Sequence, residues 1–216
     1  MAIPAISPYP MPGLGDLPTN TAQWAVDPAR AVLLIHDMQK YFLRPFAAGG
    51  SPVTELVRNV TLLRERSAAL GIPVAYTAQP GGMTDEQRGL LKDFWGQGMG
   101  ADPEHQEIVD QVRPADGDLV LTNWRYSAFF RTELLAFMRA QGRDQLIVCG
   151  VYAHIGVLMT TCDAFTYDIQ PFLVGDAVAD FSREYHCSAL KYAAEQCAMT
   201  VLTDTVLAGL GRVRRS

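Results

Sequence analysis

Short runs of apolar residues recur along this chain and are separated by longer stretches with apolar residues every three or four positions. The run at residues 31–35 fits a strand that is buried on both faces, as in a parallel sheet. Similar runs predict strands at residues 72–78, 118–122, 145–151, 171–175 and 199–203. Because helical patterns fill the gaps, the sequence predicts a three-layer α/β/α fold with a mostly parallel sheet of about six strands.

Two of the helical stretches have recognisable ends. Ser51 and Pro52 predict an N-cap and a first-turn proline, and Gly71 predicts the end of that helix just before the second strand. The segment 180–182 predicts the start of another helix, which should run to about Cys197.

The chain is expected to contain one globular domain, at residues 29–210, because 216 residues suffice for one full α/β domain. Residues 1–28 are rich in proline and glycine, which disfavour regular structure. We expect them to form an extended arm that lies on the domain or on a partner subunit. The basic tail, residues 211–216, predicts only a solvated end.

Charge and composition narrow the classes of function. The chain has 18 Lys and Arg residues against 23 Asp and Glu residues, and its net charge of −5 predicts no nucleic-acid partner. A small-molecule ligand is expected instead. No apolar run approaches the roughly 20 residues that span a bilayer, so no membrane partner is expected. The four cysteines lack the spacing of a zinc site and no signal segment precedes the domain, which together predict a cytoplasmic location.

Polar residues follow the predicted strands at their carboxyl ends, where α/β folds bind ligands. Asp37 ends the first strand and is the first candidate for a catalytic acid, although an Asp here is equally suited to cap a helix. The second strand leads to Gln79 and then to Arg88. The fourth strand passes through a turn, residues 149–156, into a helix whose first amides can hold an anion.

Six sequence blocks occur together in a fixed order. They are His36-Asp37-Met38-Gln39, Tyr76-Thr77-Ala78-Gln79-Pro80, residues 90–96, Trp124-Arg125-Tyr126-Ser127, residues 150–156 and residues 176–182. In this order they resemble the isochorismatase-like hydrolases, a branch of the cysteine-hydrolase superfamily that also contains nicotinamidases. The resemblance covers roughly residues 5–208 and is to the free-standing members rather than to those with an aryl carrier domain.

The resemblance implies hydrolysis of an enol ether, which releases pyruvate from isochorismate or from 2-amino-2-deoxyisochorismate. It leaves open which of the two is the substrate, and whether the pathway is of the phenazine or the siderophore type. A carboxylic acid must protonate the terminal vinyl carbon, and Asp37 is the residue suited to that role. The implied substrate-binding residues are Phe42, Gln79, Arg88, Trp95 and Tyr152. The resemblance implies neither a metal nor a cofactor, and it suggests a homodimer.

Two positions depart from the family pattern. The amidase branch carries a cysteine nucleophile where this chain has Gly156, so the sequence favours enol-ether hydrolysis over a cysteine-type amidohydrolase. The family places a catalytic lysine immediately before the Trp-Arg-Tyr-Ser block, where this chain has Asn123. Asparagine can donate a hydrogen bond but brings no positive charge. A catalytically impaired binding protein, or a variant that traps a complex, therefore stays open as an alternative.

Several other residues are expected to be structural. His36 precedes Asp37 on its strand and should point to the opposite face, where it would form a structural hydrogen bond. His154 is suited either to touch a ligand or to bond the backbone of its own turn. Arg125 is expected to pair with a structural acid rather than with a ligand. Cys149 and Cys162 are expected in the core, and core or subunit contacts are expected for Phe129 and Phe130.

Overall fold

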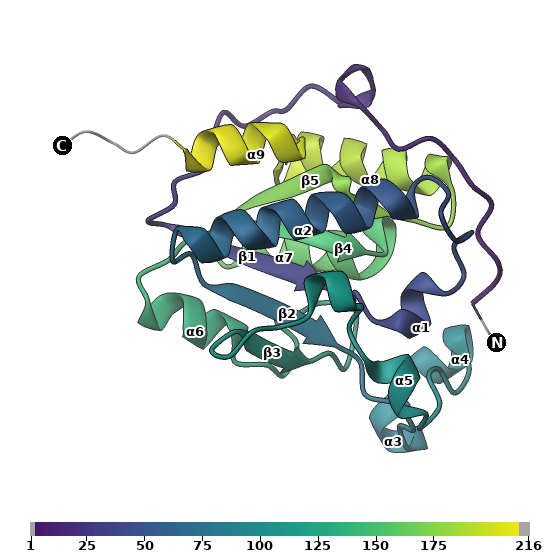
Figure 1. Ribbon diagram of the computed structural model, residues 1–216. Helices are drawn as coiled ribbons and strands as arrows, with labels where there is room; N and C mark the ends of the chain where they lie inside the picture. Colours follow the sequence, from purple (N-terminus) through teal and green to yellow (C-terminus); the bar gives the residue numbers. More distant parts are fainter. Residues whose placement is uncertain (1–2, 212–216) are drawn as a thin grey trace.

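Six parallel strands form one sheet in the computed structural model, which describes residues 3–211 (Figure 1). Across the sheet they are β3 (Leu119–Thr122), β2 (Val74–Ala78), β1 (Ala31–His36), β4 (Gln145–Val151), β5 (Gln170–Ala179) and β6 (Met199–Val201). The strand order runs outward in opposite directions from β1 and β4, so the topological switch point lies between these two central strands. The predicted three-layer architecture and strand number are confirmed.

Both faces of the sheet are covered by helices, which is why the central strands are apolar throughout. Every residue of β1 is buried, with Leu33 and Ile35 in the core on one face and Val32 and Leu34 in the core on the other. The first face is covered by α2 (Val53–Ala69) and α9 (Thr203–Leu210), and the second by α6 (Leu134–Ala140), α7 (Leu158–Thr166) and α8 (Arg183–Gln196).

Four short helices gather at the end of the sheet toward which the strand arrows point (Figure 1). They are α1 (Lys40–Leu43), α3 (Asp85–Arg88), α4 (Leu91–Trp95) and α5 (Pro103–Gln106). Two 3-10 turns, Leu14–Asp16 and Asp110–Val112, and one π-helical turn, Ala153–Val157, complete the helical elements of the part that the structure describes. None of the helices within residues 3–211 is long and apolar enough to cross a bilayer.

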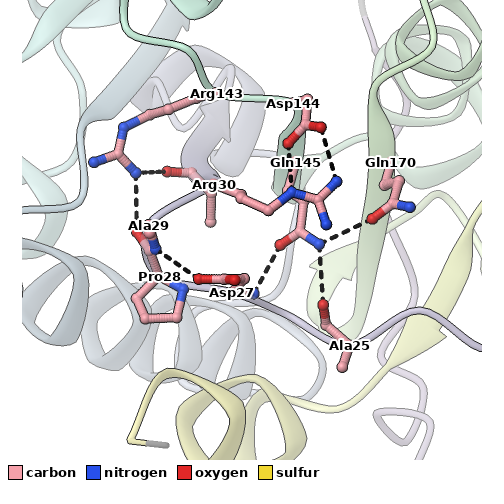
Figure 2. Close-up of polar contacts among 10 residues, drawn as sticks. Ala25, Asp27, Pro28, Ala29, Arg30, Arg143, Asp144, Gln145 and Gln170 are labelled. Atoms are coloured by element: carbon pink, nitrogen blue, oxygen red, sulfur yellow. Dashed lines mark hydrogen bonds and ion pairs between the residues drawn. The ribbon is translucent and has the colours of Figure 1, made fainter. Parts of the chain in front are cut away.

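The N-terminal segment, residues 3–28, lies along the domain. Near its end, the buried side chain of Gln145 on β4 accepts a hydrogen bond from the Asp27 amide and donates to the Ala25 carbonyl (Figure 2). The same amide group donates to Gln170 Oε1 on β5, so one side chain joins the arm to two strands. Arg143 donates to the carbonyl oxygens of Pro28 and Ala31 beside it. These contacts lie at the amino ends of the strands, away from the four short helices.

Several expected element ends were wrong. β2 begins at Val74 rather than at residue 72, and β6 ends at Val201 rather than at residue 203. For two further ends a distant contact is the reason. Helix α2 begins at Val53 with Pro52 at the N-cap position, because the Ser51 hydroxyl accepts a hydrogen bond from the Met11 amide of the arm instead. Strand β5 runs to Ala179 rather than ending at residue 175. Its Asp176 accepts hydrogen bonds from the amide and hydroxyl of Thr203, which ties this stretch to the start of α9.

Other predicted ends agree with the structure. Gly71 follows α2 with a φ of +65°, and the Ser182 hydroxyl caps α8 by accepting a hydrogen bond from the Tyr185 amide. Of the basic tail, residues 212–216 lie outside the described residues.

Candidate active site

A cavity opens at the carboxyl ends of the central strands. Its position beside the switch point is where open α/β sheets bind ligands. The cavity is lined by all eight predicted site residues, Asp37, Phe42, Gln79, Arg88, Trp95, Asn123, Tyr152 and Gly156. The structure therefore brings together residues from five separate stretches of the sequence.

Asp37 follows β1 directly and is buried, with 7% of its surface exposed. Its φ of +49° lies in the left-handed region, which ends the strand at this residue. The Thr77 hydroxyl donates to Asp37 Oδ1 at 2.6 Å, and Asn123 Nδ2 donates to Asp37 Oδ2 at 2.8 Å. Asp37 does not cap a helix, because the N-cap of α1 is Gln39. Both carboxyl oxygens are thus fixed by neighbouring strand ends.

Asn123 lies just beyond β3 and is almost completely buried, at 1% exposure. Its backbone amide donates to the Ala78 carbonyl at 2.9 Å, which fixes the position of the side chain beside Asp37. The Asn123 carbonyl oxygen, Oδ1, is a buried acceptor that has no hydrogen-bond partner among residues 3–211.

Arg88 ends α3 and presents a buried positive charge to the cavity. Its guanidinium donates to the Gly96 carbonyl at 2.9 Å and to Gln79 Oε1 at 3.1 Å, and it forms no ion pair with an Asp or Glu of the described chain. Burial lowers the pKa of Arg88, and the nearby charge of Arg125 adds to this effect. A buried cation without a counterion favours the binding of an anion.

Arg125 also lines the cavity, from the segment after β3. It was expected to pair with a structural acid, but within the described residues it donates only to the carbonyl oxygens of Gln87 and Trp124. The expected pairing is therefore wrong. The reason is that these two backbone carbonyls, one of them 38 residues away in the sequence, satisfy part of the guanidinium and leave its charge unpaired.

Aromatic side chains form the apolar part of the wall. The Tyr152 hydroxyl donates to the Phe42 carbonyl at 2.6 Å, and its ring lies 4.4 Å from that of Phe181. Burial raises the pKa of Tyr152, so the hydroxyl stays protonated and holds this hydrogen bond. On another side, Trp95 Nε1 donates to the Tyr126 hydroxyl at 2.8 Å. These groups shape the cavity beside the Asp37 carboxyl.

Gly156 packs directly against the His36 ring. A Cβ atom at position 156 would lie only 2.4 Å from His36 Cε1, so any larger residue would displace the ring. The ring is fully buried, with Nδ1 3.2 Å from the Val151 carbonyl and Nε2 3.3 Å from the Tyr126 carbonyl. The structural role expected for His36 agrees with these contacts. The site accordingly has no room for a nucleophilic side chain at this turn.

The expectation that His36 and Asp37 point to opposite faces was wrong. His36 Nδ1 lies 3.6 Å from Asp37 Oδ2. Alternation along a strand requires extended backbone, and Asp37 leaves that conformation.

The turn after β4, Ala153–Val157, is π-helical and leads into α7. It was expected to offer amides to an anion, but the His154 amide already donates to Asp180 Oδ2 at 2.7 Å. His154 Nδ1 lies 2.6 Å from Asp180 Oδ1, and its ring stacks on Tyr185. His154 therefore bonds the carboxyl group of Asp180, the residue that follows β5, rather than the backbone of its own turn.

Several cavity residues were missed by sequence reasoning. Tyr41, Tyr126 and Phe181 lie in or beside the motif blocks and could have been proposed as wall residues on that ground. Ile3 also lines the cavity, but it belongs to the proline-rich arm and carries no signal in the sequence. Its place depends on the path of the arm, including the β-bridge between Ile6 and Phe46.

The fold and the site together define an α/β enzyme with an acid and unpaired cations in one small-molecule cavity. The sequence pattern of the isochorismatase domain matches residues 31–205. The chain belongs to the isochorismatase family.

Known proteins similar to this chain include a probable isochorismatase of Pseudomonas chlororaphis, at 60% identity over 95% of this chain and 98% of that protein. The phenazine biosynthesis protein PhzD of Pseudomonas fluorescens is 58% identical, again over 95% of this chain and 98% of that protein. A crystal structure of a cysteine hydrolase from Pseudomonas syringae pv. phaseolicola 1448A superposes with a TM-score of 0.79 at 20% identity, over 89% of this chain and 97% of the other. This last likeness concerns the fold alone.

Proposed function

We propose that this chain hydrolyses the enol-ether bond of isochorismate or 2-amino-2-deoxyisochorismate and releases pyruvate, with Asp37 as general acid. One observation carries the proposal. The Asp37 carboxyl, fixed through both oxygens, faces a cavity that also contains the unpaired guanidinium of Arg88. An enol-ether dicarboxylate needs both a proton donor and an anion site.

The proposed reaction begins with the carboxyl proton of Asp37. The Thr77 hydroxyl accepts a hydrogen bond from the Asp37 amide at 3.0 Å and therefore directs its own hydrogen to Oδ1. Oδ2 accepts a hydrogen bond from Asn123 Nδ2, so both oxygens hold the carboxyl group in place for proton transfer. Transfer of this proton to the terminal vinyl carbon produces an oxocarbenium ion. Water adds to that ion, and the resulting hemiketal breaks down to pyruvate and the ring alcohol.

The two arginines are placed to bind the two carboxylates of such a substrate. Arg88 and Arg125 both line the cavity without an acidic partner in residues 3–211, and a guanidinium matches a carboxylate through its planar fork. Gln79 Oε1 accepts a hydrogen bond from Arg88, so the NH₂ group of the Gln79 side chain stays available to donate to the ligand. The aromatic wall of Phe42, Trp95 and Tyr152 suits the apolar ring of the substrate.

The relatives support both candidate substrates, because one is named an isochorismatase and another a phenazine biosynthesis protein. They favour an active enzyme over a silent binding protein. The contact between Gly156 and His36 argues against the cysteine-type amidohydrolase.

The test is pyruvate release from each enol ether by the parent protein and by Asp37→Asn. We expect the substitution to lower kcat by about 100- to 10,000-fold with little change in substrate affinity, since the acid acts in the transition state. Asp93→Asn is the matched control, because Asp93 is an exposed acid on α4 and its loss should leave the rate unchanged. Binding without turnover in the parent would favour the silent binding protein.

We also propose that the enzyme works in the cytoplasm as a homodimer. Phe130 and Tyr167, at 39% and 42% exposure, flank the buried Phe129 and offer an apolar surface for a second copy. The four free cysteines suit a reducing compartment. Sedimentation equilibrium would give the mass of the assembly directly.

A further inference from the structure

Two cysteine thiols lie side by side on the face of the sheet that α7 and α8 cover. Cys162 belongs to α7, and Cys197 is the residue that follows α8. Their Sγ atoms are 3.7 Å apart, which is hydrogen-bonding distance for two sulfur atoms. Both thiols are free, and neither is among the residues that line the cavity. The proposed hydrolysis therefore makes no use of this pair.

The two thiols differ in exposure and in acidity. Cys162 is partly exposed, whereas Cys197 is buried. The hydrogen bond with Cys197 lowers the pKa of Cys162, although partial burial opposes this effect. Oxidants react with the thiolate rather than with the thiol. Cys162 is therefore the sulfur that reacts first, and the Cys197 thiol lies next to the product.

We propose that Cys162 and Cys197 form a reversible oxidation site, at which a peroxide converts the two thiols into a disulfide. An accessible thiolate beside a second thiol is the arrangement that redox-sensing cysteines share. A disulfide bond is about 2.05 Å long, so the two sulfurs need to approach each other by about 1.7 Å. Changes in the side-chain torsions of the two cysteines move the sulfurs over distances of this size. The inference does not depend on which substrate the enzyme hydrolyses.

The proposed chemistry is balanced for hydrogen peroxide, the simplest peroxide. The Cys162 thiolate attacks one oxygen, the O–O bond breaks, and Cys162 becomes a sulfenic acid as hydroxide leaves. Cys197 then attacks the sulfenic sulfur and loses its proton, so that the S–S bond forms and water leaves. In total, two thiols and one hydrogen peroxide give one disulfide and two water molecules. A thiol reductant restores both cysteines by thiol–disulfide exchange.

The disulfide would join two helices that both start at the cavity wall. α7 continues from the turn that contains Ile155 and Gly156, and α8 begins soon after Phe181. A covalent link between α7 and the end of α8 restricts the unfolded chain and so stabilises the fold. We expect oxidation to raise the Tm by about 5–10 °C.

The experiment treats the reduced chain with hydrogen peroxide, blocks the remaining thiols with N-ethylmaleimide and maps disulfides by mass spectrometry without reductant. It compares the parent with Cys162→Ser, Cys197→Ser and Cys187→Ser. Cys187→Ser is the matched control, because Cys187 is also partly exposed and lies on α8 but has no hydrogen bond to another thiol within residues 3–211. We expect the parent and Cys187→Ser to form a bond between residues 162 and 197, which dithiothreitol removes. Only these two proteins should show the rise in Tm.

Three results of the mapping would overturn the proposal. They are a disulfide that includes Cys187, a disulfide between two chains, and oxidation of Cys162 to a sulfinic acid while Cys197 stays free. An unchanged Tm in the oxidised parent would overturn the stabilising role of the bond. The map of the parent alone carries the test if a serine variant does not fold, because it identifies the bonded pair directly.

Discussion

The glycine at position 156 is required by the ring beneath it rather than by its own backbone conformation. Gly156→Ala places a Cβ atom 2.4 Å from His36 Cε1, and the ring cannot move without losing its contacts with the Val151 and Tyr126 carbonyls. We expect a loss of about 1–3 kcal/mol in the free energy of unfolding. Urea unfolding measures it. Activity should fall as well, because His36 and Asp37 are neighbours.

Gly100→Ala is the control for this substitution, since a Cβ atom at Gly100 meets nothing within 4 Å. It should leave stability almost unchanged. If Gly156→Ala were as stable as the parent, the contact with His36 would not restrict this position.

At the scale of elements, one buried glutamine joins the arm to the sheet. Gln145→Leu leaves the Asp27 amide, the Ala25 carbonyl and Gln170 Oε1 without their partner (Figure 2). With about 1–3 kcal/mol for each unsatisfied buried group and partial relief by water, we expect the free energy of unfolding to fall by about 2–5 kcal/mol. The urea midpoint should drop while the KM of the folded enzyme stays the same. The reason is that the network lies at the amino ends of the strands, whereas the cavity lies at their carboxyl ends.

Gln141→Leu serves as the comparison, because Gln141 is exposed at the end of α6. An equal loss of stability in both variants would mean that added apolar surface, not the lost hydrogen bonds, is responsible.

The elements that the sequence predicts well are those whose burial is complete. β1 and β4 are continuous apolar runs because helices cover both faces, and a run of this kind is visible without knowing what covers it. The start of α2 and the end of β5 were misplaced, because Ser51 and Asp176 bond to segments 40 and 27 residues away. Local patterns contain no information on such contacts.

The residues of the candidate site also divide into those that local sequence patterns predict and those whose contacts come from distant segments. Asp37, Gln79 and Asn123 each follow a strand, and parallel strands bring their carboxyl ends to one edge. The eight predicted residues therefore meet in one cavity. The partners of Arg125 and His154 could not be predicted, because each depends on a carbonyl or carboxylate from a distant segment. The same holds for Ile3 of the arm.

For the whole molecule, stability should depend on pH through one buried histidine. His186 Nε2 lies 2.9 Å from the Gly175 carbonyl, so this nitrogen carries the hydrogen, and Nδ1 accepts from the Tyr9 hydroxyl at 3.1 Å. Tyr9 in turn accepts from the Asp180 amide at 2.7 Å. This chain of bonds satisfies both nitrogens of a neutral His186. Burial lowers the pKa of His186 accordingly.

A lowered histidine pKa stabilises the fold at neutral pH and loses this contribution in acid. The unfolded chain takes up a proton near the ordinary value of about 6.5, whereas the folded chain does so only at lower pH. We expect the free energy of unfolding to decrease from about pH 6.5 downward until the folded pKa is reached. His186→Gln should have a lower free energy of unfolding than the parent at pH 8. Below about pH 6.5 its free energy of unfolding should decrease less steeply with falling pH than that of the parent. His105→Gln removes a histidine outside the core and should keep the parent's slope; identical slopes in all three proteins would contradict the assignment.

The packing of Gly156 against His36 also bears on how such a site can evolve. If Gly156 is replaced by cysteine first, the new side chain collides with the His36 ring. If His36 is replaced by a smaller residue first, two buried hydrogen bonds are lost and a void is left. We expect each single substitution to lower the stability of the fold, whereas the two together would make room for a thiol. The two substitutions should therefore show sign epistasis, which opposes a stepwise route from this site to thiol chemistry.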